Sequence, residues 1–521
     1  MRSRTPAYVA AALVLAYASF LAARSAGGFP ERLQHGRHVP YLSDKPLGED
    51  AYYMIAIGWN LGNGQGLSYG GQPTTGTQPL MTLAYGALAS VVHATGGDRW
   101  TFARAALALN GALFVAFWPI AYGTARALSP SSDRDATAAA AAALTLFNYT
   151  LFRLFTYGLE TGLYLLLAGS CVLLSIRVLR RTPSLADVVP LGLAAGIAAL
   201  ARIDFLLVFA LFMGLAALGG RVAFSRVLAA GLAAGAIVLP WFAYVHQVSG
   251  RWMPTSGESQ SRLIDAASAT TRLHAVVAAI AHHLSPWFYP ELVTSMRPRG
   301  VVLAASAALI AAAVPFLVRA RKVADDNAWN TVELWAAAIL ALVAVYVVCF
   351  WPTYFYLRYS ALAAVLTIPA LAVGLASLAG ARWRTAILPA AAAAFAVTAL
   401  VTLHRGMAGN SLSVTSEFID RHVPRDARVG AFSSGVSGYF FDNVTNLDGK
   451  VNAAAMRARR DGRLGRYINE SGISILIDWP ETMRQFVDPA YIDACWQPCG
   501  LPMLPEQGRC FVRRPCDASR W

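Results

Sequence analysis

The sequence predicts a polytopic α-helical membrane protein with a small α/β domain at its C-terminal end. The chain has 521 residues, of which 56% are hydrophobic and only 14% are charged, whereas soluble domains carry about a quarter charged residues. The apolar residues form long runs rich in Ala, Leu and Val, and many of these runs are long enough to cross a bilayer. From residue 404 onward the apolar runs become shorter and alternate with turn residues.

Eleven apolar runs are predicted to cross the membrane. Cytoplasmic loops are enriched in Arg and Lys, and here the arginine-rich loops all fall on the side of the N-terminus. We therefore expect a multi-pass membrane protein with a cytoplasmic N-terminus, and the Ala- and Arg-rich composition suggests the inner membrane of a bacterium. The net charge of +14 is spread over these loops, which argues against nucleic-acid binding. The predicted spans are residues 8–26, 101–125, 136–152, 163–178, 188–200, 205–218, 227–245, 301–318, 332–350, 357–376 and 385–403.

Two apolar stretches are not expected to form single spans. Residues 188–220 have arginine-rich flanks at both ends, so two short helices that turn near residues 201–205 satisfy the charge rule. This turn places Arg202 and Asp204 at the outer membrane face. Residues 77–93 are expected to form a juxtamembrane or re-entrant helix, because an additional span would invert every later one.

Three segments are then expected outside the membrane. The membrane module, residues 1–403, has a first outer loop at residues 27–100 and a second at residues 247–300. Residues 404–521 are expected to form an extracytoplasmic α/β domain. In the second loop, apolar residues at helical spacing predict a helix at the membrane surface. These residues are Leu273, Val276, Val277, Ile280 and Leu284.

Four of the six cysteines lie near the end of the chain. Cys495, Cys499, Cys510 and Cys516 have C-x3-C and C-x5-C spacings with no histidine nearby, which is not a zinc pattern. We expect them to form disulfides in an oxidising compartment. Four cysteines allow three connectivities, and the sequence does not choose among them.

Ionisable residues gather at the predicted outer ends of the helices. Charged groups at membrane depth are costly and usually face a cavity or a partner. Topology places them on the same side as Glu49 and Asp50, so their convergence predicts a functional site. The residues are Arg153, Glu160, Arg202, Asp204, Arg358 and Tyr359.

Each of these residues has a structural and a functional interpretation. Asp50 begins a predicted helix, where it is either an N-cap or a general base kept ionised by the helix dipole. Arg202 and Arg358 either bind a phosphate with their paired donors or form ion pairs inside the membrane, for example Arg202 with Asp204 or Glu160. His282 and His283 fit a solvated helix end better than a metal site.

Four motifs follow one another along the predicted membrane module. They are EDAYYMIAIGWNLGNGQGLSYGGQPTTGTQPL at 49–80, YGLETGLY at 157–164, LARIDFLL at 200–207 and MPTSG at 253–257. Together they resemble the motifs of the multi-span GT-C glycosyltransferases. This family uses polyprenyl-phosphate sugars and includes protein O-mannosyltransferases, the lipid A aminoarabinose transferase and arabinofuranosyltransferases. Two strings in the terminal domain, GAFSSGVSGYF and NLDGKVN, add a less specific likeness.

The resemblance implies a GT-C-like membrane protein that transfers a sugar, with inversion, from a polyprenyl-phosphate donor to an acceptor hydroxyl at the outer face. Arabinofuranosyl or mannosyl transfer in cell-envelope assembly is expected, with a glycan, lipid or protein as acceptor. Asp50, with Glu49 beside it, is the implied base, and Arg202 and Arg358 are the implied phosphate ligands. No metal ligands stand out, although some relatives use a divalent cation. The implied sugar-binding or acceptor-binding residues are Glu160, Asp204, Gln78, Tyr359, Thr255 and Ser256.

Two other function classes stay open at the level of the sequence. A transporter or flippase of lipid-linked sugars would have inverted repeats with broken helices in both halves, and the sequence shows no such repeat. A non-catalytic membrane protein with a binding ectodomain would not need the acidic pair or the buried arginines.

Overall fold

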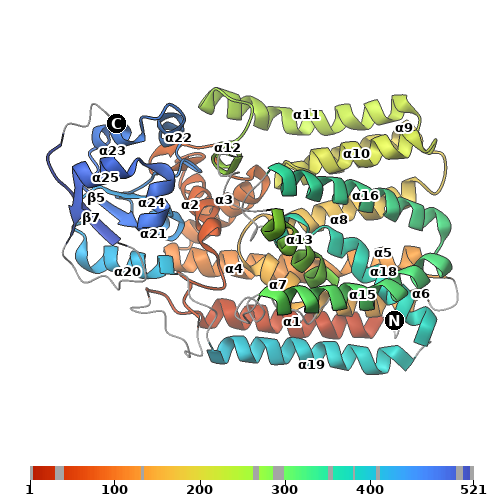
Figure 1. The fold of residues 1–521 in the computed structure, drawn as a ribbon. Coiled ribbons are helices and arrows are strands. Elements are labelled where there is room, and N and C mark those ends of the chain that lie inside the picture. The colour runs from red at the N-terminus through yellow and green to blue at the C-terminus, as the bar shows by residue number, and fades with distance from the viewer. Residues whose placement is uncertain are drawn as a thin grey trace.

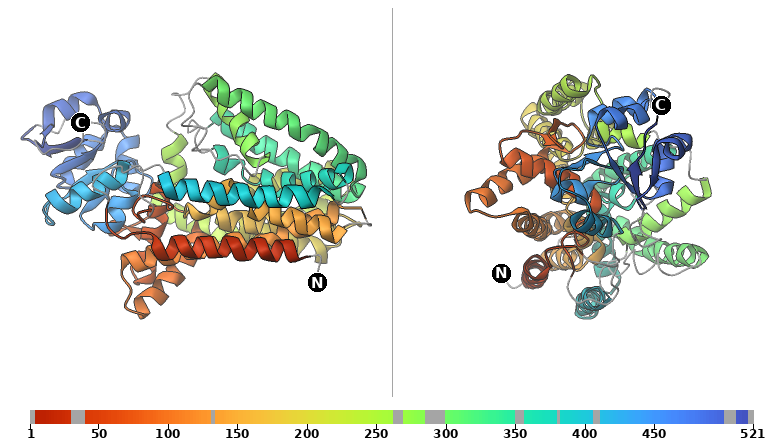
Figure 2. Two further views of the ribbon diagram at one scale, coloured as in Figure 1. Left: turned by 90° about the horizontal axis from the view of Figure 1, so that it is seen from below. Right: turned by 90° about the vertical axis from the view of Figure 1, so that its left-hand side faces the viewer.

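The protein combines a long helical bundle with a sheet-containing region at one end (Figure 1). We call this part, residues 411–499 and 509–516, the terminal region. The computed structural model describes residues 4–29, 40–130, 134–261, 269–284, 299–349, 356–379, 382–405, 411–499 and 509–516. The described N-terminus lies at the opposite end of the bundle from the terminal region. The left view of Figure 2 shows the same elongated arrangement from below, and the right view looks along the bundle from the side of the terminal region.

Most of the chain is helical. The bundle helices are α1 (Thr5–Arg24), α4 (Arg99–Ala116), α5 (Trp118–Leu128), α6 (Arg134–Leu146), α7 (Tyr149–Thr156), α8 (Thr161–Val178), α9 (Leu185–Ala201), α10 (Phe205–Leu218), α11 (Phe224–Ser249), α13 (Ala269–Leu284), α15 (Arg299–Val323), α16 (Asp326–Cys349), α17 (Tyr356–Tyr359), α18 (Ala363–Ala379) and α19 (Arg382–Arg405). Near the terminal region lie α2 (Glu49–Gly62), the hairpin β1 (Ser68–Tyr69) and β2 (Gln72–Pro73), α3 (Pro79–Ala94) and α12 (Thr255–Ser261).

The apolar helices are those of a multi-pass membrane protein. Among the described residues, seven helices are long and apolar enough to span a bilayer, and the bent pair α6–α7 would be an eighth. Three of the five shorter apolar helices, α9, α10 and α18, coincide with the remaining predicted spans. Residues 77–93, expected as a juxtamembrane or re-entrant helix, form the short apolar helix α3, which packs on α2.

Two predicted spans are broken, whereas the one at residues 101–125 runs on through α4 and α5 with only Phe117 between them. The span at residues 136–152 breaks before Asn148, whose side chain accepts a hydrogen bond from the Leu151 backbone N–H and starts α7 at a bend of 57°. The span at residues 357–376 is divided into α17 and α18. His283 on α13 holds this break, because its Nε2 lies 3.1 Å from the Leu357 carbonyl oxygen and 2.9 Å from Ser360 Oγ.

The helix predicted at the membrane surface, α13, packs against α15, α17 and α18. Its buried residues include Ala279, Ala281 and His283, whereas Leu273 is exposed. The expectation of a solvated helix end is therefore wrong for His283, which is buried in the bundle, and the side chain of His282 lies outside the described part of the chain. Residues 262–268 and 285–298 of the second predicted outer loop also lie outside the described part of the chain.

The predicted turn between two short helices near residues 201–205 is confirmed. Helix α9 ends at Ala201, and α10 begins at Phe205. Arg202, the C-cap of α9, has extended backbone angles, φ −157° and ψ 110°, which end this helix before the turn into α10.

Arginines from several helices meet at the end of the bundle that holds the N-terminus. Arg4 lies over the ring of Tyr122 at 5.1 Å, and Arg126 pairs with Asp135 at 2.7 Å. Arg221 donates to the Asn327 carbonyl oxygen at 3.3 Å. The positive-inside rule supports the proposal that this end faces the cytoplasm.

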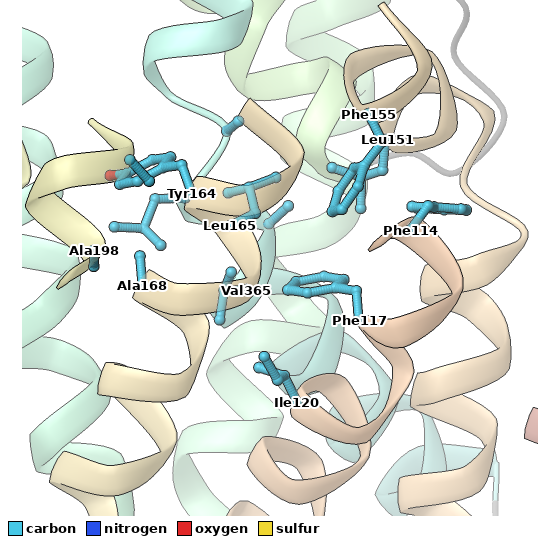
Figure 3. Close-up of a cluster of buried hydrophobic side chains, with 14 of the residues drawn as sticks. Phe114, Phe117, Ile120, Leu151, Phe155, Tyr164, Leu165, Ala168, Ala198 and Val365 are labelled. Carbon is cyan, nitrogen blue, oxygen red and sulfur yellow. The ribbon is translucent and has the colours of Figure 1, made fainter. Parts of the chain in front are cut away.

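Small residues allow the bundle helices to approach closely, as in other membrane bundles. A Cβ atom added at Gly192 would lie 2.3 Å from the Ala230 carbonyl oxygen, and one added at Gly374 would lie 2.0 Å from that of Phe316. Larger side chains fill the centre, where aromatic rings and aliphatic groups from α4, α5, α7, α8 and α18 meet (Figure 3).

The terminal region contains one mixed five-stranded sheet, in the order β4-β3-β5-β7-β6. Strand β3 is parallel to β4 and β5, whereas β7 is antiparallel to β5 and β6. The strands are β3 (Val429–Ala431), β4 (Val444–Asn446), β5 (Ile475–Asp478), β6 (Trp496–Pro498) and β7 (Arg509–Arg513). The helices are α20 (Ser411–His422), α21 (Gly435–Phe440), α22 (Ala453–Arg460), α23 (Leu464–Glu470), α24 (Pro480–Phe486) and α25 (Pro489–Cys495).

Two disulfides link the segment around α25 and β6 to the segment around β7, and they select one of the three connectivities. Cys495 pairs with Cys516 and Cys499 with Cys510, at sequence separations of 21 and 11 residues.

Replacing Cys495 and Cys516 together by Ser is expected to destabilise the terminal region by about 3 kcal/mol, because the closed loop restricts the unfolded chain. The melting temperature of this region in detergent, monitored by its susceptibility to proteolysis, measures the loss of stability. An unchanged melting temperature would contradict it.

Candidate functional site

A cavity of about 320 Å³ lies where α2, the α9–α10 turn, α16, α17 and the terminal region meet. It brings together residues that are far apart in the sequence. Of the residues predicted for the site, those that line it are Asp50, Gln78, Glu160, Arg202, Asp204, Ser256, Arg358 and Tyr359. Glu49 and Thr255 lie beside the cavity without lining it.

The start of α2 is fixed by a close contact with the Tyr157–Tyr164 motif. Gly48 is the N-cap, and its backbone N–H donates to the Tyr157 carbonyl oxygen at 2.9 Å. A Cβ atom at Gly48 would lie 1.9 Å from the Tyr157 ring, so a larger side chain does not fit. Asp50 is the second residue of the helix and makes no capping bond, so the interpretation of Asp50 as the N-cap is wrong.

Glu49 holds the terminal region against α2. Its Oε1 accepts a hydrogen bond from the Gly435 backbone N–H, and its Oε2 accepts one from Val436 at 3.1 Å. These N–H groups begin α21, where a carboxylate also interacts favourably with the helix dipole. Burial raises the pKa of Glu49 to about 7 even though both hydrogen bonds oppose the rise.

Asp50 faces the cavity and lies beside a lysine of the terminal region. Lys450 Nζ is 3.2 Å from Asp50 Oδ1. Burial alone would raise the pKa of Asp50, but the positive charges of Lys450 and Arg358 outweigh burial and hold the pKa below its usual value. Asp50 is therefore ionised at neutral pH, as a proton acceptor must be.

Arg202 forms the ion pairs that the sequence left open as an alternative. Its Nη2 lies 2.8 Å from Asp204 Oδ2, and its Nη1 lies 3.4 Å from Glu160 Oε1. All three residues line the cavity. A buried arginine is costly without such partners, so we infer that the two carboxylates position its guanidinium at the cavity wall.

Two stacked tyrosines form another part of the wall. Tyr346 on α16 and Tyr359 on α17 have ring centroids 4.2 Å apart. The Arg202 guanidinium lies 4.6 Å from the centre of the Tyr359 ring, and that of Arg358 lies 5.3 Å from it. The Tyr346 hydroxyl also donates to Asp204. Arg358 thus reaches the cavity beside an aromatic surface.

Thr255 fixes the segments around the cavity. Its hydroxyl donates to the Lys450 carbonyl oxygen at 2.8 Å, and its backbone N–H donates to Thr75 Oγ1 at 3.2 Å. Thr255 therefore ties α12 to both the terminal region and the loop after α2. The neighbouring Ser256 and Gln78 line the cavity directly.

Lys450, Tyr53 and Tyr346 also line the cavity, and sequence reasoning did not single them out. Lys450 lies within the NLDGKVN string, which was the only signal that could have found it. Arg153, in contrast, is buried away from the cavity, where it donates to the Pro46 carbonyl oxygen at 3.3 Å.

A second cavity, of about 860 Å³, lies beside the loop after α2. Its wall mixes apolar and neutral polar side chains with one arginine, and the polar ones include Gln65, Gln72, Tyr244, Gln247 and Arg457. Its wall contains none of the residues predicted for the site. In the part of the chain that the structure describes, no group of three or more His, Cys, Asp or Glu residues is arranged to hold a metal ion.

Solved structures match this chain along nearly its whole length. The crystal structure of ArnT from Cupriavidus metallidurans bound to undecaprenyl phosphate matches with a TM-score of 0.54 and 13% identity, over 98% of each chain. That of Archaeoglobus fulgidus oligosaccharyltransferase in complex with Zn and sulfate matches with a TM-score of 0.50 and 13% identity, over 96% of this chain and 73% of the other. Both proteins are GT-C glycosyltransferases. This chain has the GT-C fold.

No protein-family model and no curated protein sequence matches the chain. The GT-C fold therefore rests on three-dimensional similarity alone. The motifs that carried the resemblance in sequence contribute residues to one cavity of this fold: Asp50 and Gln78 from the first motif, Glu160 from the second, Arg202 and Asp204 from the third, and Ser256 from the fourth.

Proposed function

We propose that this protein transfers a sugar from a polyprenyl-phosphate donor to an acceptor hydroxyl. The observation that carries the proposal is an ionised carboxylate, Asp50, in a cavity that also presents Arg358. Asp50 accepts the proton of the acceptor hydroxyl, whose oxygen forms a bond to the anomeric carbon of the sugar. The bond from this carbon to the phosphate oxygen breaks, and its electron pair stays on the phosphate. A single displacement of this kind inverts the anomeric configuration.

The shape of the cavity supports a lipid-linked donor. One turn deeper in the bundle than Asp204 and Tyr346, the wall becomes apolar through Leu207 on α10 and Leu342 on α16. Leu207 is also 40% exposed, so the apolar wall continues to the outside of the bundle. A polyprenyl phosphate has the same two parts, a charged head and an apolar chain. The ArnT structure of the same fold is bound to undecaprenyl phosphate.

The polar residues around Asp50 have roles that follow from their contacts. Arg358 neutralises part of the phosphate charge, and Arg202 is held at the wall by Asp204 and Glu160. Gln78, Ser256 and Tyr359 contact the sugar or the acceptor, as their positions in the cavity wall allow. Glu49 and Thr255 position these groups instead of touching the substrate.

We place the cavity at the extracytoplasmic face of a bacterial inner membrane and residues 404–521 outside it, because the arginine-rich end of the bundle lies opposite. Arabinofuranosyl or mannosyl transfer in cell-envelope assembly follows from the resemblance of the motifs.

A donor panel tests the proposed function. The purified protein is incubated with polyprenyl-phosphate sugars that differ in the sugar, with and without candidate acceptors, and release of polyprenyl phosphate is measured. We expect turnover of one donor class, and that class names the sugar. If no donor is consumed, while proteoliposomes move the lipid-linked sugar across the bilayer, the protein is a transporter and the proposal fails.

A further inference from the structure

Lys450 enters the cavity from the loop between β4 and α22, and this loop is held on several sides. The Lys450 backbone N–H donates to Asp448 Oδ1 at 2.8 Å, and its carbonyl oxygen accepts a hydrogen bond from Thr255. On the other side, a Cβ atom at Gly76 would lie 1.8 Å from the Lys450 carbonyl oxygen. The terminal region thus places this lysine against the membrane module through contacts with two different segments.

The ammonium group of Lys450 lies between two carboxylates at the edge of the cavity. Nζ is 3.2 Å from Asp50 Oδ1 and 3.4 Å from Asp448 Oδ2, and it lies 5.6 Å from the centre of the Tyr53 ring. The side chain is 23% exposed and lines the cavity. A ligand bound beside Asp50 would therefore contact Lys450 as well.

We propose that Lys450 binds the donor phosphate and stabilises the charge that this phosphate gains as the sugar leaves. The inference rests on the proposed function. The donor phosphodiester carries one negative charge, and the released polyprenyl phosphate carries up to two. During the same step Asp50 takes up a proton and loses its charge. Negative charge therefore moves from Asp50 to the phosphate, and Lys450 lies where it interacts with both.

This arrangement predicts which kinetic constant depends on Lys450. An interaction that strengthens as charge develops raises kcat more than it lowers KM. Removing one such preorganised donor typically lowers kcat by about 100-fold to 1,000-fold. Lys450→Met is therefore expected to lower kcat by about this factor, with a smaller change in the KM of the donor. Lys450→Arg keeps the charge and is expected to retain more turnover than Lys450→Met.

The experiment uses the full-length protein in detergent and measures binding of undecaprenyl phosphate together with donor turnover. Arg460→Gln is the matched control, because Arg460 also joins the terminal region to α12, through Glu258 at 3.9 Å, but does not line the cavity. We expect Lys450→Met to weaken binding of undecaprenyl phosphate by about 10-fold, roughly the 1.4 kcal/mol that separates affinities by that factor, and Arg460→Gln to leave it unchanged. If Lys450→Met does not fold, Lys450→Arg, which keeps the positive charge, is compared with Lys450→Gln, which removes it.

The outcomes separate this inference from the proposed function. If Lys450→Met turns over the donor and binds undecaprenyl phosphate like the wild type, the inference is wrong and the function stands. If chelation of divalent ions abolishes turnover while Lys450→Met has little effect, a metal ion supplies the charge and the inference is also wrong. If the wild type consumes no donor but binds undecaprenyl phosphate through Lys450, the phosphate site stands and the proposed function fails.

Discussion

Replacing Asp50 by Asn is expected to lower kcat by about 100-fold to 10,000-fold, the range that a positioned general base contributes. The amide has nearly the same size as the carboxylate, and its oxygen still accepts a hydrogen bond from Lys450, so folding and donor binding are expected to persist. Release of polyprenyl phosphate under saturating donor measures kcat, and the melting temperature shows whether the variant folds.

Asp442→Asn is the matched control for this substitution. Asp442 is an exposed carboxylate of the terminal region that pairs with Arg99, away from the cavity. It loses the same charge without touching the site, so wild-type turnover is expected. Wild-type turnover by Asp50→Asn as well would remove Asp50 as the base and leave Glu49 as the next residue to test.

Replacing Glu49 by Ala is expected to separate the terminal region from α2 and to abolish turnover. The backbone N–H groups of Gly435 and Val436 would lose their acceptor in a buried interface. Leaving a buried donor unsatisfied costs about 1–3 kcal/mol. The melting temperature in detergent and the rate of proteolysis of the terminal region measure the loss. An unchanged melting temperature would show that other contacts are sufficient.

Glu49→Gln isolates the effect of the charge. Burial raises the pKa of Glu49 to about 7 from its ordinary value of 4.5, so the folded protein holds this proton more tightly than the unfolded chain. The stabilisation from Glu49 is therefore complete below the ordinary pKa of 4.5 and is lost as the pH rises through about 7. Glu49→Gln is expected to remove this part of the pH dependence of the melting temperature. The same slope in both proteins would contradict the assignment.

The fold was largely predictable because apolar periodicity and arginine placement are local signals. The turn at Arg202 followed from charge alone, since both flanks of residues 188–220 are arginine-rich. The bend at Asn148 comes from a local N-cap, a signal that the sequence carries but that the apolar pattern hides. The break before α18 was not predictable in this way, because it depends on a hydrogen bond between Ser360 and His283 of a distant helix. The buried position of His283 also depends on packing between helices that are distant in the sequence.

The sequence predicted the cavity residues that membrane topology places together. It did not predict those that the terminal region contributes. Asp50 in the first turn of α2, Arg202 at the C-terminal end of α9 and Arg358 in α17 all line the cavity at the end of the bundle next to the terminal region. Lys450 comes from the terminal region, and its approach to Asp50 depends on the docking of a loop 400 residues away in the chain. The different roles of Glu49 and Asp50 also appear only in three dimensions, because the two residues are adjacent and chemically alike.

The most direct test of the central claim is an experimental structure of the protein with undecaprenyl phosphate bound. The account predicts that the phosphate lies in the cavity within hydrogen-bonding distance of Arg358, near Asp50, and that the lipid chain leaves between α10 and α16 past Leu207. A phosphate held elsewhere, for example in the second cavity beside Tyr244, would contradict the assignment of Asp50 and its neighbours as the donor site.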